Sequence, residues 1–232
     1  GAIYSNYNLL QLTPSVAWKI LPNVAIGVGG NVNWSSLSAD PFPATPPNAS
    51  GYPDATHTAS AWGAGFTAGV TYKPIDELAL GAVIKSPQWF NSFRWHGQYP
   101  DGAPASFGYR LNYPMIIGVG GAYTPLPEWL VASDVKWINY AGTDGFGQKN
   151  FATSPTGPYV RGLGWENIWT FSLGVQYKVV PRVPLRIGYN FGQNPIPSNQ
   201  QFINAFAPAI VQHHLTLGFG VDVTSALQLN VA

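Results

Sequence analysis

Large apolar residues alternate with small or polar residues over much of the chain, most clearly between residues 62 and 73. One face of this stretch holds Trp62, Ala64, Phe66, Ala68, Val70 and Tyr72. The opposite face holds Gly63, Gly65, Thr67, Gly69, Thr71 and Lys73. A period of two predicts a β-strand. Because an aromatic residue stands at each end of the apolar face and the other face is small or polar, the pattern is typical of a transmembrane β-barrel strand.

The same alternation recurs along the chain. Clear copies begin at Val24, Leu78, Ile117, Trp169, Leu185 and Leu215, and weaker ones run through 10–20 and 129–140 and start again at 227. We count about ten strands, each near the 9–11 residues that cross a bilayer when tilted. Short proline-rich turns alternate with long connections at about 36–58, 86–107, 141–166 and 192–211. Short periplasmic turns and long extracellular loops are the pattern of bacterial outer-membrane barrels.

The composition also indicates a membrane location. Charged residues make up only 9% of the 232 residues and hydrophobic residues 46%, whereas soluble domains carry about 25% charged residues. No run of about eighteen apolar residues occurs, which argues against a transmembrane helix. Cysteine is absent, which excludes disulfides and thiolate chemistry. The net charge of +1 gives no indication of nucleic-acid binding.

We therefore predict an all-β protein, an antiparallel up-and-down transmembrane β-barrel in the bacterial outer membrane. Residues 1–232 are expected to form a single barrel domain. Open strand edges are not stable in lipid. Because both ends of the chain fall close to or within a strand, we expect this domain to be incomplete at both ends.

A series of segments occurs in a recognisable order. It consists of Tyr113-Pro114-Met115-Ile116-Ile117-Gly118-Val119-Gly120-Gly121-Ala122-Tyr123, Asp134-Val135-Lys136-Trp137, Gly164-Trp165-Glu166-Asn167, Arg186-Ile187-Gly188-Tyr189, Asn194-Pro195-Ile196-Pro197 and His213-His214-Leu215-Thr216-Leu217-Gly218-Phe219-Gly220. Over nearly the whole chain this series resembles the FadL/TodX outer-membrane transporters of long-chain fatty acids and hydrocarbons. The resemblance implies a barrel of fourteen strands plugged by an N-terminal hatch, of which this chain would match about the fourth to the thirteenth strand.

The resemblance also implies a ligand-binding role for Arg161, at a position where the family uses a cation to hold a fatty-acid carboxylate. Arginine suits this role because its planar guanidinium binds a carboxylate through two parallel hydrogen bonds. The alternatives are an exposed loop arginine or a partner of Glu166. Apolar residues of the long connections are the other candidate ligand contacts: Trp89, Phe90, Phe151, Trp165, Phe202, Phe206 and Ile210. The alternatives for these are an aromatic girdle at the lipid–water boundary, or loops packed on one another.

Ionisable residues on the polar faces of the strands are expected to line the lumen. They are Lys85, Asp134, Lys136, Arg186, His214 and Asp222. A partly wet interior needs such groups for stability, so pairing within a lumen network is the first interpretation. Lining the substrate path is the second.

The predicted function is passive transport of long-chain fatty acids or hydrocarbons, with no enzyme activity, no cofactor and no metal site. Loop aromatic residues would capture the compound, which would then diffuse into the cell envelope. Outer-membrane lipid and the hydrophobic ligand are the expected partners, and nucleic acid is not. A general diffusion porin, a barrel lipase using Ser172 and His214, and a soluble β-sandwich lectin remain the alternatives.

Overall fold

A computed structural model of the chain describes residues 4–147, 151–180, 182–201, 204, 209–222 and 227–231. Within these ranges it describes only the backbone of Phe151, Asp222 and Gln228. The described residues form β-strands and one short 3-10 helix, η1 (Ser198–Gln200). None of their helices is long and apolar enough to cross a membrane.

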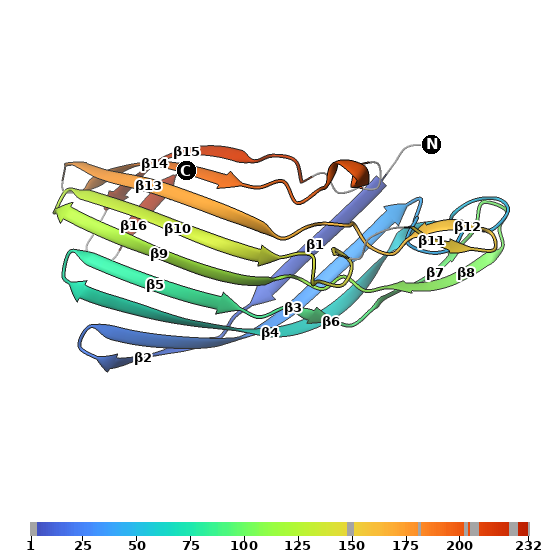
Figure 1. The fold of residues 1–232 in the computed structure, drawn as a ribbon, viewed down its shortest axis with the longest axis horizontal. Coiled ribbons are helices and arrows are strands. Elements are labelled where there is room, and N and C mark those ends of the chain that lie inside the picture. The colour runs from blue at the N-terminus through green and yellow to red at the C-terminus, as the bar shows by residue number, and fades with distance from the viewer. Residues whose placement is uncertain are drawn as a thin grey trace.

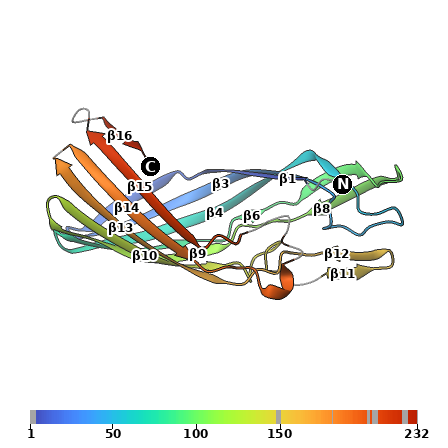
Figure 2. The same ribbon diagram turned by 90° about the horizontal axis from the view of Figure 1, so that it is seen from above.

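One antiparallel sheet forms the wall of the molecule, and the predicted all-β, up-and-down architecture is confirmed. The strand order is β1-β3-β4-β5-β9-β10-β13-β14-β15-β16, with β2 paired to β3 and β6 paired to β4. Their bounds are β1 (Tyr4–Leu12), β2 (Ser15–Leu21), β3 (Val24–Asp40), β4 (Ala55–Ile75), β5 (Leu78–Lys85), β6 (Trp89–Phe90), β9 (Met115–Leu126), β10 (Trp129–Asn139), β13 (Ile168–Val180), β14 (Val183–Gly192), β15 (His213–Asp222) and β16 (Gln228–Val231). The wall curls into a trough (Figures 1 and 2). Among the described residues no pairing joins β16 to β1 or β2, so the sheet is not closed.

The strands β1 and β2 are one wall strand interrupted at Pro14. Both pair with β3 in the same register, Leu12 opposite Val32 and Ser15 opposite Gly29. Pro14 accepts a hydrogen bond from the Gly30 N–H at 3.1 Å. Because proline has no N–H to donate in return, the ladder is broken there, as proline is tolerated only at a sheet edge or a bulge.

The alternating faces predicted from the sequence are present in the wall. Trp62, Phe66 and Val70 project outward and are 61%, 49% and 40% exposed. On the inner face, Gly63 and Gly65 face the side chains of Phe90 and Gln88. Large apolar groups on a face with no protein over it fit a surface in contact with lipid.

Two strands are much longer than predicted. β3 has 17 residues and β4 has 21, where about ten were expected. The connection predicted at 36–58 is therefore strand at both ends and connects only residues 41–54. At about 3.3 Å per residue, 21 residues reach about 70 Å, more than twice the hydrocarbon thickness. The pair therefore continues beyond the membrane.

Two further long connections, predicted without strands, contain β-hairpins. The first is β7 (Phe93–Gln98) with β8 (Pro104–Tyr109), and the second is β11 (Phe151–Ser154) with β12 (Gly157–Val160). Both project at the same end of the wall (Figure 1). A small apolar core joins the first hairpin to the extensions of β3 and β4; its buried members are Ala39, Phe42, Ala55, Ala59, Ala61, Phe90, Phe93 and Trp95. This core packs the first hairpin against the extensions of β3 and β4.

Candidate ligand cavity at the long-loop end

A cavity of about 540 Å³ lies at the long-loop end, on the inner side of the wall. Its lining residues come from β1, β3, the connection after β3, β8, β12 and the loops after β8, β10 and β12. They are Ser5, Tyr7, Leu37, Ala39, Pro41, Phe42, Pro43, Ala44, Tyr52, Tyr109, Leu111, Tyr113, Tyr140, Phe146, Val160, Leu163 and Trp165. None of these described lining residues carries a formal charge. Apart from the indole N–H of Trp165, hydroxyl groups are their only polar side-chain atoms.

Phe42 forms one wall of the cavity and is fixed by an aromatic stack. Its ring centroid lies 4.8 Å from that of Trp95 and 5.2 Å from that of Phe107. The Phe42 N–H also donates to the Pro53 carbonyl at 3.0 Å. The ring is therefore held before any ligand enters.

Tyr140, Phe146 and Trp165 form the facing wall. The ring centroids are 5.3 Å apart for Tyr140 and Phe146, and 4.9 Å apart for Trp165 and each of the other two. The Trp165 backbone N–H donates to the Phe146 carbonyl at 2.9 Å, so the two loops that carry these rings are joined. The turn before Phe146 requires glycine, because Gly145 has a φ of +85° and an added Cβ would lie 2.7 Å from Leu111 Cδ1.

Two tyrosines of the cavity lining, Tyr109 and Tyr140, have a raised pKa. The Tyr109 hydroxyl donates to the Gly145 carbonyl at 3.1 Å, and burial raises the pKa of Tyr109. Burial, with a smaller contribution from Tyr113, raises the pKa of Tyr140 to about 12. Both effects disfavour the phenolate, which would be poorly solvated here. The cavity is accordingly uncharged at neutral pH.

A largely buried group of three side-chain amides, Gln11, Asn33 and Gln88, lies beneath the cavity on the inner face; we call it the amide cluster. Asn33 donates to Gln88 Oε1 at 2.9 Å, and Gln11 donates to Asn33 Oδ1 at 2.6 Å and to Gln88 Oε1 at 3.3 Å. Lys85 Nζ donates to Gln11 Oε1 at 2.8 Å and lies 6.0 Å from the centroid of the Tyr113 ring. Tyr113 lines the cavity, so Lys85 lies close to its floor.

A β-bulge places Gln88 in this cluster. β4 pairs Thr67 with Lys85 but Gly63 with Phe90, so the segment from Lys85 to Phe90 contains one residue more than the facing segment from Gly63 to Thr67. Bulges redirect side chains in this way. The Gln88 side chain lies against Gly65, where an added Cβ would be 2.5 Å from Gln88 Nε2.

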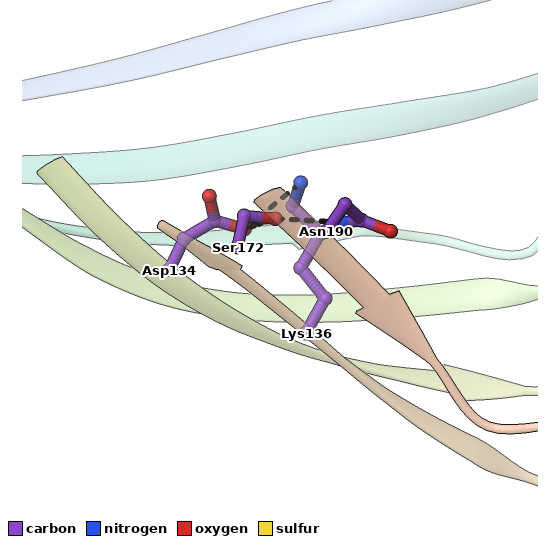
Figure 3. A network of polar contacts seen from close by, with 4 residues as sticks. All are labelled: Asp134, Lys136, Ser172 and Asn190. Carbon is purple, nitrogen blue, oxygen red and sulfur yellow. Dashed lines mark hydrogen bonds and ion pairs between the residues drawn. The ribbon is translucent and has the colours of Figure 1, made fainter. Parts of the chain in front are cut away.

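A second polar network crosses β10, β13 and β14 on the inner face (Figure 3). Lys136 Nζ lies 3.0 Å from Asp134 Oδ1, and Ser172 Oγ donates to the same oxygen at 3.4 Å. Asn190 Nδ2 donates to Ser172 Oγ at 2.9 Å. The predicted lumen residues Asp134 and Lys136 thus belong to a hydrogen-bonded network on the inner wall.

The other predicted lumen residues also lie on the inner face where they are described. Arg186 donates to Gln176 Oε1 at 2.8 Å, and His214 is in register with Asn190. The side chain of Asp222 lies outside the described residues. Among the described residues no hydrogen bond joins Ser172 to His214, and no cluster of three or more His, Asp or Glu side chains could hold a metal ion.

The predicted ligand contacts are distributed over several environments. Trp165 lines the cavity, whereas Phe90 lies in the apolar core and Trp89 is 53% exposed on the outer face. Ile210 is 64% exposed.

Arg161 is exposed and is not among the lining residues, although its neighbour Val160 is. Phe202, Phe206 and the side chain of Phe151 lie outside the described residues. A ligand role for these residues stays a prediction.

The site predicted from the sequence left out the tyrosines of the cavity and Asn204, which holds Trp165 in place. Tyr7 and Tyr113 sit in or next to wall strands, so their positions in the sequence resemble those of girdle residues. A usable signal was the density of tyrosine just before and after strand ends, as at Tyr109 and Tyr140. The density of tyrosine does not indicate which of these rings are in contact.

An antiparallel wall with lipid-facing apolar residues, and with long connections at one end only, defines an outer-membrane β-barrel protein. Residues 2–232 match the family described as outer membrane protein transport protein (OMPP1/FadL/TodX). The chain belongs to this family. Its members are outer-membrane transport channels and not enzymes.

Solved structures show the same fold. The Ralstonia pickettii toluene transporter TbuX is similar with a TM-score of 0.72 and 16% identity, over 97% of this chain and 61% of that one. The P. putida toluene transporter TodX is similar with a TM-score of 0.70 and 19% identity, over 97% and 62%. A Pseudomonas aeruginosa FadL homologue gives a TM-score of 0.69 and 19% identity, over 97% and 58%. The chain therefore spans about three fifths of these proteins. No individual curated protein matches it.

Proposed function

We propose that the protein takes up neutral hydrophobic molecules, hydrocarbons among them, in the cavity at its long-loop end and lets them cross the outer membrane by passive diffusion. The observation that carries this proposal is the uncharged, largely aromatic lining of a 540 Å³ cavity. Cavities of this size, mostly apolar with a few polar groups, are typical of small-molecule sites. A neutral ligand loses no charge solvation on entering such a lining.

Burial of the ligand supplies the driving force for capture. Each buried methylene contributes about 0.8 kcal/mol, and ring–ring contacts with Phe42, Phe146 and Trp165 add to this. The sequence contains no nucleotide-binding motif that would couple the movement to an energy source. Proteins of similar structure support a hydrocarbon ligand, since TbuX and TodX are described as toluene transporters and CymD as a monoaromatic hydrocarbon channel.

Fatty acids are the second candidate cargo, and Lys85 favours them. Its ammonium lies 6.0 Å from the centroid of the Tyr113 ring, which lines the cavity, and forms no ion pair with any described residue. A carboxylate that reached Lys85 would leave its chain in the aromatic cavity above. On this geometry Lys85 is better placed as an anchor than the exposed Arg161.

The test uses two ligands with the same chain, dodecane and dodecanoate, as competitors of a fluorescent apolar probe on the purified protein. Phe146→Ala removes a cavity wall, and Phe171→Ala is the matched control because Phe171 is 45% exposed on the outer face. We expect about a tenfold loss of dodecane affinity in Phe146→Ala, equivalent to about 1.4 kcal/mol, because the apolar area that the ring buries against the ligand is lost, and little change in the control. Equal affinity in both variants would contradict the proposal. Loss of dodecanoate binding alone in Lys85→Met would favour the fatty acid.

A further inference from the structure

Two arginines stand side by side on the outer face of the β7–β8 hairpin. Phe93 and Trp95 are buried, so the alternating Arg94 points away from the core and is exposed. Arg94 is paired with Gly108 in the register, and Arg110 follows two residues later with an exposed side chain. Diagonal neighbours of this kind lie about 7–8 Å apart, within reach of one anionic group.

Neither guanidinium has a partner among the described residues. No ion pair or side-chain hydrogen bond joins Arg94 or Arg110 to the described part of the chain. Asp54 lies beside Gly97, farther along the hairpin, and Asp101 lies in its turn. Because arginine stays charged at any physiological pH, each guanidinium keeps a positive charge that no described carboxylate pairs with.

The pair lies just beyond the aromatic girdle. Trp62 and Trp89 are exposed on the same outer face, on the paired strands β4 and β6. Exposed tryptophans of a barrel mark the membrane–water boundary. Arg94 comes five residues after Trp89, so at about 3.3 Å per residue it stands at most about 16 Å farther out. The pair therefore lies on the polar side of this boundary, where the headgroup region begins.

We propose that Arg94 and Arg110 form a binding site for the phosphate group of an outer-leaflet lipid headgroup. Guanidinium groups bind phosphate oxygens through paired, charge-assisted hydrogen bonds. The site is separate from the ligand cavity, because Tyr109, between Gly108 and Arg110, lines that cavity on the opposite face of the hairpin. Binding there fixes the hairpin at the membrane surface and holds the mouth of the cavity at headgroup level.

The test compares two lipids on the intact, detergent-purified protein by native mass spectrometry: bisphosphorylated lipid A, and the same lipid after enzymatic dephosphorylation. The variant is Arg94→Gln with Arg110→Gln. The control is Lys73→Gln with Lys19→Gln, which removes the same charge from exposed residues at the short-turn end. We expect the wild-type protein and the control to prefer the phosphorylated lipid by about tenfold, and the double arginine variant to lose that preference.

Two results would overturn the proposal. One is an unchanged preference in the double arginine variant. The other is full competition by millimolar inorganic phosphate, which would identify the site as one for free phosphate. Dodecane binding, measured on the same samples, reports on the fold and on the cavity separately, so a failure here is distinguishable from a failure of the proposed transport function.

Discussion

The indole N–H of Trp165 donates to Oδ1 of Asn204 at 2.5 Å, although the two residues are 39 positions apart. Asn204 is 3% exposed and uses its Nδ2 to donate to the carbonyls of Leu163 and Gln200, both at 2.8 Å. One side chain thus holds both the ring of Trp165 and the backbone of Leu163, and both residues line the cavity.

Asn204 is not among the residues that line the cavity. Replacing it with alanine should nevertheless weaken ligand binding. The indole loses its acceptor and the ring is free to leave the cavity wall. A hydrogen bond of this kind contributes about 0.5–1.5 kcal/mol, so we expect roughly a three- to tenfold loss of affinity for an apolar fluorescent probe. The measurement is a probe titration of the purified variant.

A double-mutant cycle tests whether Asn204 acts through the indole. Trp165→Phe keeps an aromatic ring but removes the N–H. In that background Asn204→Ala should cost much less than in the wild-type protein. Additive losses would show that Asn204 supports the loop in general and does not orient Trp165.

The bulge at Gln88 depends on the absence of a side chain at Gly65. Gly65→Ala would place a methyl group 2.5 Å from Gln88 Nε2 and displace that amide from the cluster. We expect a loss of about 1–3 kcal/mol in the free energy of unfolding, measured by urea titration in micelles. Gly30→Ala is the control, because a Cβ at Gly30 meets nothing within 4 Å. Equal losses in both variants would refute this account of the bulge.

The two polar networks of the inner face should differ in their contribution to stability. Asn33 is fully buried, and Asn33→Ala removes the two shortest of the three amide–amide hydrogen bonds in the amide cluster. Leaving buried partners unsatisfied should cost about 1–3 kcal/mol. Lys136→Met breaks an ion pair whose side chains are 44% and 36% exposed, so about 0–1 kcal/mol is expected. Urea unfolding of both variants tests whether Asn33→Ala lowers the free energy of unfolding more than Lys136→Met does.

Tyr140 should make the protein less stable in alkali. Its pKa is raised from 10.0 to about 12 in the folded protein, so the folded state keeps the proton that the unfolded state loses. The stabilisation is complete below pH 10 and is lost as the pH rises toward 12. The thermal midpoint of Tyr140→Phe should fall less over this interval than that of the wild-type protein. Ultraviolet titration of the phenolate should show one late-titrating group fewer in the variant.

Much of the wall could be predicted from the sequence, because the alternation within each strand shows which face is apolar and which is small or polar. The alternation at 62–73 and 169–178 requires only the period of two of an extended backbone. It assigns Lys85, Asp134, Lys136 and Arg186 to the polar face of their strands. The extensions of β3 and β4 could not be recognised from this alternation, since alanine, serine and threonine replace most of the large apolar residues there once the strands leave the lipid.

The cavity could not be predicted in this way. Its walls bring together Phe42, Tyr109, Phe146 and Trp165, which belong to different segments far apart in the sequence. Which of many loop aromatics meet depends on the bulge after β5, on the two hairpins and on the hydrogen bond from Trp165 to Asn204. The sequence by itself determined the membrane-spanning parts of the wall strands, their two faces and the membrane setting, because those follow from local periodicity. Only the tertiary structure decided the ligand cavity and the exposed positions of Arg94, Arg110 and Arg161, because side-chain contacts between distant segments exist only after the chain has folded.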